Sequence, residues 1–206
     1  MKKTVIASAM TLLCGVAFAQ GYVGAVVSLT SIGTDCSGVA SCDKKGRGGK
    51  VYFGTKFAKA NQLDFGIGSV DSLEFGVVTF GKGATTYTKQ YLDANTSTTY
   101  DLDASTSNTA NALVGTVVVR LPLFDGAAVT VRPGLAYVSS TQRYYVAGAQ
   151  NGSETATKLK PYLGLGIEFS LFQDVRVVGA FDWTKFDVAD HHSSLKAFGV
   201  GAEIGF

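Results

Sequence analysis

The sequence predicts an all-β chain that folds as an eight-stranded antiparallel up-and-down transmembrane β-barrel. Apolar and polar residues alternate in eight segments, most of them about ten residues long, the length that a tilted strand needs to cross a bilayer. Short connections alternate with long polar ones. The face opposite the apolar residues combines charges with many glycines and alanines, which suits a narrow interior better than a solvated surface.

The amino-terminal segment has the pattern of a secretory signal peptide. Two lysines follow the first methionine, an apolar run comes next, and Ala17–Ala19 forms a small-x-small cleavage site. We therefore expect residues 1–19 to be removed and residues 20–206 to form one outer-membrane barrel domain. A membrane anchor is the alternative, but the apolar run is short for a spanning helix of about 20 residues.

The charge balance of the mature chain bears on one class of function. Cleavage leaves 187 residues, enough for one domain, with 16 basic and 16 acidic side chains. A formal net charge near zero gives no support to nucleic-acid binding through bulk electrostatics. We expect no cofactor.

The two cysteines that remain after cleavage predict a disulfide. Cys36 and Cys42 lie in the polar stretch Thr34–Lys45, and they form an even pair in an exported protein. A bridge between them would close a small loop. A metal site is the alternative, but no histidine lies nearby.

The first four strands are identified by their alternation. In GYVGAVVSL, valines and a leucine face one side while tyrosine and glycine face the other. KVYFGTKFAK and LEFGVVTF repeat the pattern with a lysine and a glutamate on the polar side, and ALVGTVVVRL does so with an arginine. We expect these strands at Gly21–Leu29, Lys50–Lys59, Leu73–Phe80 and Ala112–Leu121.

The last four strands follow the same rule. AAVTVRPGLAYVS is joined to the strand before it by a turn around Asp125-Gly126. LKPYLGLGIEFSL and VRVVGAFDWTKF are joined by the turn Phe172–Asp174, and LKAFGVGAEIGF comes last. We expect these strands at Ala127–Ser139, Leu159–Leu171, Val175–Phe186 and Leu195–Phe206.

The remaining connections are expected to be loops. Short turns at one end and long polar loops at the other are typical of bacterial outer-membrane barrels. The stretch Thr96–Ser107, rich in threonine and serine, is expected to be a mobile polar loop. The long or moderate connections are Ile32–Gly49, Ala60–Ser72, Gly81–Asn111, Ser140–Lys158 and Asp187–Ser194.

Charges gather on the face that we assign to the interior. The apolar faces carry charges at strand ends alone, where a charge facing lipid costs little. The opposite faces hold five positive and four negative groups, and we expect these to pair because an unpaired buried charge is very costly. This predicted lumen charge network consists of Lys56, Glu74, Arg120, Arg132, Lys160, Glu168, Arg176, Asp182 and Glu203.

Proline and aromatic residues add two local expectations. Pro133 lies inside the fifth strand, where it removes a ladder donor, and a bulge would accommodate it. Tyr137, Trp183 and Phe206 lie near strand ends on the apolar face. We interpret them as interfacial anchors rather than as ligand-stacking residues.

Three motifs carry a family resemblance. GYVGA, KPYLGLGIEF and AFGVGAEIGF resemble segments of the OmpA-like small outer-membrane β-barrel proteins, and the likeness covers essentially the whole mature chain. The resemblance implies insertion in the outer membrane of a Gram-negative cell, with both termini in the periplasm and the long loops outside. Phe206, with apolar residues at alternate positions before it, resembles the carboxyl-terminal signal read by the barrel assembly machinery. A periplasmic peptidoglycan-binding domain is not expected.

These observations favour a non-enzymatic barrel with a structural, surface-interaction or weak porin-like pore role. A lumen filled by paired charges would conduct little. The expected partners are outer-membrane lipid and lipopolysaccharide, the barrel assembly machinery, periplasmic chaperones and an extracellular ligand bound through the long loops.

Other functions stay open at this point. His192 and Ser194, with Asp187 or Asp190 to orient the imidazole, could serve a deacylase-like enzyme that modifies lipid A. A metal site formed by His191 and His192 would need further ligands, and the sequence contains no other histidine. A soluble exported β-sandwich or a lipocalin is the remaining alternative.

Overall fold

The computed structural model describes residues 20–33, 36, 39–58, 62–93, 98–188 and 191–206. The predicted signal peptide and Asp190 lie outside these residues. Within them no helix is long and apolar enough to cross a membrane. The strands are β1 (Gly21–Ile32), β2 (Ser41–Asp43), β3 (Lys45–Lys56), β4 (Leu63–Asp64), β5 (Ser69–Asp93), β6 (Thr98–Phe124), β7 (Ala127–Val146), β8 (Ala149–Ser170), β9 (Val175–Val188) and β10 (His191–Gly205).

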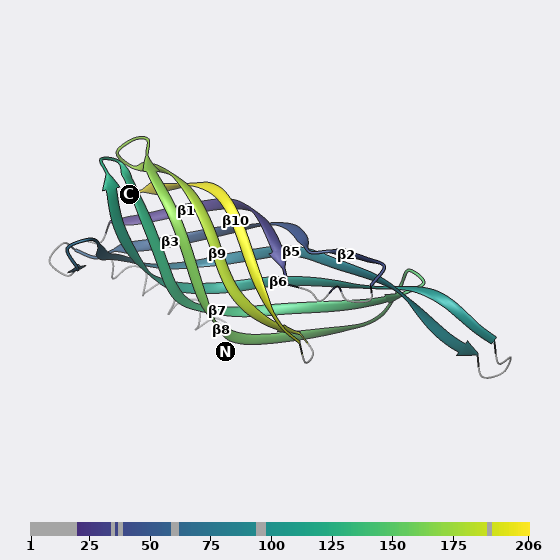
Figure 1. The fold of residues 1–206 in the computed structure, drawn as a ribbon. Coiled ribbons are helices and arrows are strands. Elements are labelled where there is room, and N and C mark those ends of the chain that lie inside the picture. The colour runs from purple at the N-terminus through teal and green to yellow at the C-terminus, as the bar shows by residue number, and fades with distance from the viewer. Residues whose placement is uncertain (1–19, 34–35, 37–38, 59–61, 94–97, 189–190) are drawn as a thin grey trace, which may run out of the picture.

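Eight of these strands form a closed antiparallel ring (Figure 1). The order is β5-β3-β1-β10-β9-β8-β7-β6, and the pairing of β5 with β6 closes it, while β2 and β4 pair with β5 outside the ring. The eight-stranded antiparallel barrel is therefore confirmed. The alternative of a soluble β-sandwich is wrong, because one ring replaces the two stacked sheets that a sandwich requires.

The seam of the barrel joins its first and last strands. The Gly21 amide donates to the Phe206 carbonyl over 3.0 Å, and the Phe206 amide donates to the Gly21 carbonyl over 2.9 Å. The ladder then runs without a register shift from Tyr22, opposite Gly205, to Ile32, opposite Leu195. The start of β1 and the end of β10 consequently lie together at the end of the barrel that also carries the short turns.

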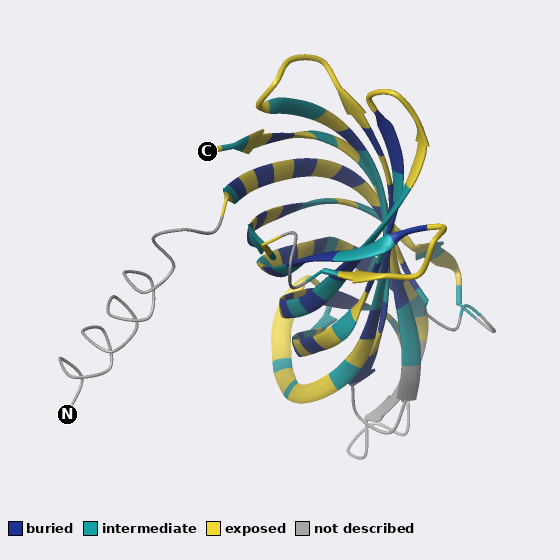
Figure 2. Ribbon diagram, turned by 90° about the vertical axis from the view of Figure 1, so that its left-hand side faces the viewer, coloured by how far each residue is buried: buried dark blue, intermediate teal, exposed yellow. Residues whose placement is uncertain are grey.

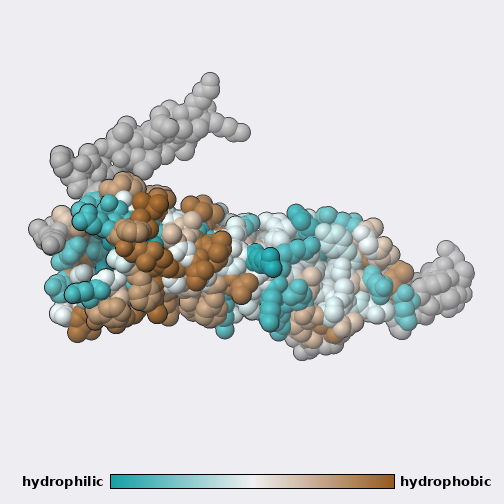
Figure 3. Space-filling model, turned by 90° about the horizontal axis from the view of Figure 1, so that it is seen from above, coloured by the Kyte–Doolittle hydropathy of each residue, from teal (hydrophilic) through white to brown (hydrophobic). Residues whose placement is uncertain are grey.

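Burial alternates along the strands as the sequence predicts, and Figure 2 shows buried and exposed bands in turn. On β1, Tyr22 is 2% exposed whereas Val27 is 72% exposed. Figure 3 shows one side of the molecule. Hydrophobic residues gather over its barrel part, and more hydrophilic residues lie toward the opposite end. The outward apolar band fits a hydrocarbon environment, and the buried polar residues line the interior.

The strands extend well beyond this apolar band, which corrects the expectation of long loops. Lys82 to Asp93 of β5 pair with Thr109 to Thr98 of β6, and β7 and β8 continue to a tight turn at Ala147-Gly148. Figure 1 shows these hairpins projecting from one end of the barrel, hereafter the hairpin end. The connections Gly81–Asn111 and Ser140–Lys158 are thus largely strand.

The same correction applies to three further stretches. Residues 98–107 of the expected mobile loop are paired strand, and residues 94–97 lie outside the described part. Half of the connection 32–49 belongs to β1, β2 and β3, while β4 and the start of β5 fall within 60–72. Threonine has a high preference for β-strands, and a sheet outside the membrane needs no apolar face. The polar composition of these strands therefore resembles that of a loop.

Pro133 occupies a gap in one ladder instead of a bulge. The pairing of β6 with β7 is interrupted between Thr116, opposite Gly134, and Val119, opposite Val131, and the register is the same on both sides. The pairing of β7 with β8 continues through Pro133, which lies opposite Leu163. The expected bulge is therefore wrong. Proline has no backbone N–H to donate toward β6, and the hydrogen bonds between β6 and β7 are missing at this point.

A disulfide joins Cys36 and Cys42, as the sequence predicts, with 5.9 Å between their Cα atoms. The bridge links the connection after β1 to β2, where Cys42 lies opposite Thr85 of β5. It therefore ties this connection to the projecting sheet.

We expect the mature chain to resist alkylation by a thiol reagent until it is reduced, because both of its cysteines are in the bridge. After reduction under denaturing conditions, intact mass should show two alkyl groups. A chain that keeps its signal peptide provides the internal control, since Cys14 would then react without reduction. Alkylation of Cys36 or Cys42 before reduction would contradict the bridge.

Candidate functional site

Arg132 of β7 forms the centre of a buried ionic network inside the barrel. Its Nε donates to Glu74 Oε2 of β5 over 3.1 Å, and its Nη2 donates to Glu168 Oε1 of β8 over 2.9 Å. Its Nη1 donates to the Thr130 hydroxyl over 2.7 Å. All four side chains are buried, so the guanidinium group compensates two carboxylates that have left water.

Lys50 of β3 extends the network across the lumen. Its Nζ lies 2.8 Å from Glu74 Oε1 and 3.7 Å from Asp182 Oδ1, and it donates to the Tyr162 hydroxyl over 3.2 Å. Tyr162 in turn donates to Asp182. The Tyr52 ring centroid lies 4.9 Å from the ammonium nitrogen, which adds a cation–π contact. Because β3 and β9 are not neighbours in the ring, these contacts cross the interior.

A second part of the network lies nearer the short turns. Arg120 Nη1 is 2.6 Å from Glu168 Oε2, and Arg120 Nε is 3.1 Å from Asp71 Oδ2. Arg176 Nη1 is 2.6 Å from Glu203 Oε1 and 3.9 Å from Glu168 Oε2. Glu168 thus connects both parts, and the cations and carboxylates nearly balance.

One glycine makes the central guanidinium position possible. Gly166 lies next to the Arg132 side chain, and a β-carbon placed on it would lie 2.5 Å from Arg132 Nη1. A larger residue would have to displace a buried charged group. This supports the sequence argument that small residues on the inner face leave room for long ones.

An apolar layer fills the lumen toward the hairpin end. This layer differs from the expectation, since the alternation of the strands predicts a polar inner face. The layer is a buried cluster that includes large side chains from five strands and smaller ones beside them. Its members are Ile32, Val78, Phe80, Ala110, Ala112, Val114, Ala136, Val138, Tyr162, Phe186, Leu195 and Ala197.

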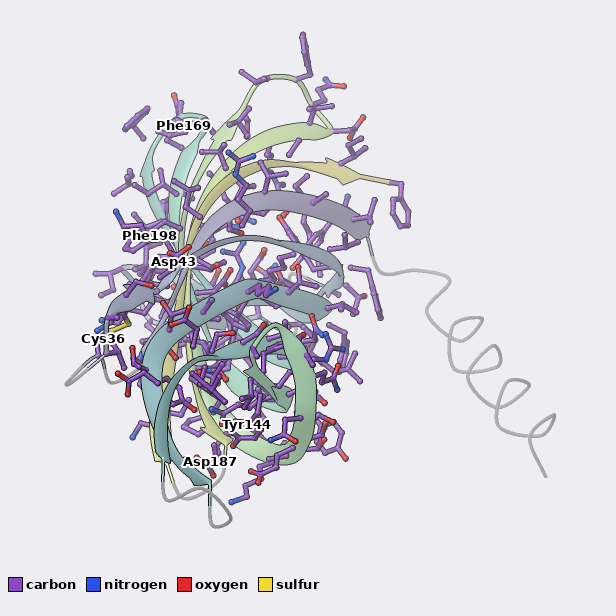
Figure 4. The ribbon with its side chains drawn as sticks, turned by 90° about the vertical axis from the view of Figure 1, so that its right-hand side faces the viewer. Cys36, Asp43, Tyr144, Phe169, Asp187 and Phe198 are labelled. Carbon is purple, nitrogen blue, oxygen red and sulfur yellow. A yellow bond between two sulfur atoms is a disulfide. The ribbon has the colours of Figure 1, made fainter. Side chains whose placement is uncertain are left out.

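Polar contacts cover the apolar layer at its outer side. Lys160 Nζ lies 2.5 Å from Asp187 Oδ2, and Lys158 Nζ lies 3.1 Å from the same oxygen. The Ser140 hydroxyl donates to the Asp187 carbonyl over 2.8 Å. In Figure 4, which looks from the hairpin end, Asp187 and Tyr144 lie near the same hairpins.

The structure brings most of the predicted interior charges together. Glu74, Arg120, Arg132, Glu168, Arg176, Asp182 and Glu203 belong to the ionic network. Lys160 pairs separately with Asp187. Lys56 is half-buried, and the ion pairs found between described residues do not include it.

Two members of the network, Lys50 and Asp71, and the partner of Lys160, Asp187, were not among the predicted interior charges. Lys50 is the first residue of the predicted strand Lys50–Lys59 and has the same parity as Lys56, so applying the alternation to that end residue would have found it. Asp71 and Asp187 fall in stretches that were assigned to connections. No sequence signal marked Asp71 as an ionic partner, and Asp187 was considered only as a carboxylate that could orient His192.

The residues of the enzymatic alternative lie where β9 and β10 meet. In the backbone register His192 is opposite Asp187 and Ser194 is opposite Lys185. The side chains of His191 and His192 lie outside the described part of the structure. Among the described side chains, no group of three or more His, Cys, Asp or Glu residues could hold a metal ion.

Comparisons with known proteins place the fold. No protein-family model matches the chain, and no curated protein sequence matches it. Among solved structures, Ail, the attachment invasion locus protein of Yersinia pestis, matches with a TM-score of 0.52 and 13% identity over 91% of this chain and 99% of Ail. Neisserial surface protein A matches with a TM-score of 0.51 and 10% identity over 90% of this chain and 97% of that protein.

Identities this low show likeness of fold and nothing further. The closed ring of eight antiparallel strands agrees with these matches. The chain therefore has the fold of the small outer-membrane β-barrel proteins.

Proposed function

We propose that this chain is an integral outer-membrane protein of a Gram-negative cell that acts without catalysis. In this proposal the barrel anchors the projecting sheet of β5 to β8 at the cell surface, where it can meet an extracellular ligand. The membership of the OmpA-like family stays a prediction, because the sequence comparisons match nothing.

The filled lumen is the observation that carries this proposal. The ionic network spans the interior near the short turns, and the apolar layer occupies it toward the hairpin end. A solute would have to break several buried ion pairs and wet an apolar layer in order to pass. The arrangement therefore favours an anchor over an open pore.

The expected partners follow from the surfaces. Lipid and lipopolysaccharide would surround the outward apolar band. Phe206, which pairs with Gly21 at the seam, is the residue that we propose the barrel assembly machinery reads, with periplasmic chaperones acting earlier. The described residues provide no observation that favours the lipid A-modifying enzyme based on His192 and Ser194.

We expect the purified full chain to show no large stable conductance in planar bilayers, because both layers of the lumen are occupied. Liposome swelling with small sugars should likewise match that of protein-free vesicles. A general porin reconstituted in the same lipid is the positive control. Insertion is checked independently by a gel shift between unboiled and boiled protein. Large steady conductance from the shifted form would contradict the closed lumen.

A further inference from the structure

We propose that the outer surface of the barrel, along β1, binds a phosphate-bearing lipid in the leaflet at the hairpin end. Lys45, Arg47 and Lys196 would hold the phosphate, and an apolar groove below them would hold an acyl chain. This inference rests on the proposed function, because it requires the apolar band to lie in a membrane.

The groove runs along the outside of β1. A hollow of about 610 Å³ has Arg47 at one end, and a second of about 430 Å³ continues it toward the short turns, sharing Val27 and Val200. Ala25 and Ala202 lie opposite one another across the seam, and their small side chains leave room there. The first hollow is lined by Val27, Ser28, Leu29, Arg47, Gly48, Phe198, Gly199 and Val200.

The length of the groove suits a flexible hydrocarbon chain. From Leu29, which lies opposite Arg47, to Ala25 the strand advances four residues, or about 13 Å. The walls are apolar, with Leu29 70% exposed and Phe198 62% exposed. Figure 4 shows Phe198 on the same side of the barrel as Asp43.

Three cations meet at the hairpin end of this groove. Ser31 of β1 lies opposite both Lys45 of β3 and Lys196 of β10, so the two lysines flank it at one level. Neighbouring strands are about 4.8 Å apart, which puts the two backbones about 10 Å from each other. Arg47 lies two residues below Lys45 on the same outward face. Their side chains can therefore converge on one small anion.

The charge of this corner is unbalanced. Lys45, Arg47 and Lys196 are exposed, and the ion pairs found between described residues do not include them. The nearest carboxylate along the chain is Asp43, whose Oδ1 accepts the Lys45 backbone amide over 3.0 Å. Three cations beside one carboxylate leave a net positive site at the edge of the apolar band.

A lipid phosphate complements this arrangement. A guanidinium group binds phosphate oxygens in a bidentate manner, and lysine ammonium groups add point charges. The site lies where a lipid headgroup meets the acyl region. A zwitterionic lipid would bring its own cation into the same corner, so we expect an anionic phosphate lipid to be preferred.

The chain contains one tryptophan, and it lies beside this corner. Trp183 of β9 is opposite Lys196 and on the outer face of the barrel. Its fluorescence can therefore report which lipids stay near the site, because bromine atoms on an acyl chain quench at short range.

The experiment reconstitutes the full chain in phosphatidylcholine vesicles with a small, equal mole fraction of brominated phosphatidic acid or brominated phosphatidylcholine. We expect brominated phosphatidic acid to quench Trp183 more strongly, with an apparent preference of about fivefold for each cation engaged. The triple variant K45Q/R47Q/K196Q should lower the preference to about one. R143Q, which removes an exposed cation in the projecting part of β7, is the matched control and should keep it.

The outcomes separate the inference from the proposed function. Equal quenching by both lipids in the unmodified chain would overturn the lipid site while leaving membrane insertion intact. Quenching by neither lipid would overturn the proposed function itself. A preference that survives in the triple variant would show that these three residues do not form the site. The gel shift of unboiled protein verifies that each variant is folded.

Discussion

Replacing Arg132 with methionine should destabilise the barrel by about 3 kcal/mol or more. The Arg132 side chain is 3% exposed, and its guanidinium group compensates two buried carboxylates, Glu74 and Glu168. Removing one partner of a buried ion pair leaves an uncompensated charge, which typically costs about 3–5 kcal/mol. Lys50 still faces Glu74 and Arg120 still faces Glu168, which places the effect at the lower end of that range. Denaturant unfolding of the chain in phospholipid vesicles measures the change.

Two variants make this result specific. Lys158→Met removes a cation whose side chain is 56% exposed, and it should cost about 1 kcal/mol or less because exposed ion pairs contribute little. In R132M/E168Q one buried carboxylate is neutralised along with the guanidinium group, so part of the lost stability should return. Equal losses for R132M and K158M would show that the lumen is hydrated and the network is not a buried one.

Replacing Leu165 with arginine should cost about 2–4 kcal/mol, because this position lies in the middle of the outward row of β8. Leu165 is 40% exposed and lies opposite Val131 and Phe181 on the neighbouring strands. A charge at that depth would face hydrocarbon. The same unfolding measurement in vesicles reports the loss.

Leu159 provides the matched comparison for this substitution. It belongs to the same outward row of β8 and is 61% exposed, but it lies at the hairpin end of the row beside Lys158. Near the interface an arginine costs about 0–1 kcal/mol, so Leu159→Arg should be close to neutral. If both arginines cost the same, the outward apolar band does not lie across a bilayer.

The barrel itself could be predicted from the sequence because its signal is local. Every second residue of a spanning strand must be apolar, so the two faces of β1 or β10 can be distinguished from a few residues. The positions of Arg132 and Glu203 in the interior follow from this parity alone. Their partners do not, because which strands face one another across the ring depends on closure and not on local pattern.

The projecting sheet and the apolar layer could not be predicted in the same way. Outside the bilayer a strand needs no apolar face. Residues such as Thr85 and Thr106, whose hydroxyl groups are hydrogen-bonded to each other, therefore resemble loop residues in the sequence. For Phe80 and Phe186 the alternation rule fails in the opposite direction. An apolar residue is assigned outward by the alternation rule, yet near the hairpin end the inner face is apolar as well.

The seam between β1 and β10 has a consequence for biogenesis. The ring is complete only once segments from opposite ends of the sequence have met, and such long-range pairing is intrinsically slow. Until then both unpaired edges can recruit strands from another molecule. A newly exported chain must therefore be kept apart from other copies until β1 pairs with β10. Closure of the ring removes both free edges and with them the risk of aggregation.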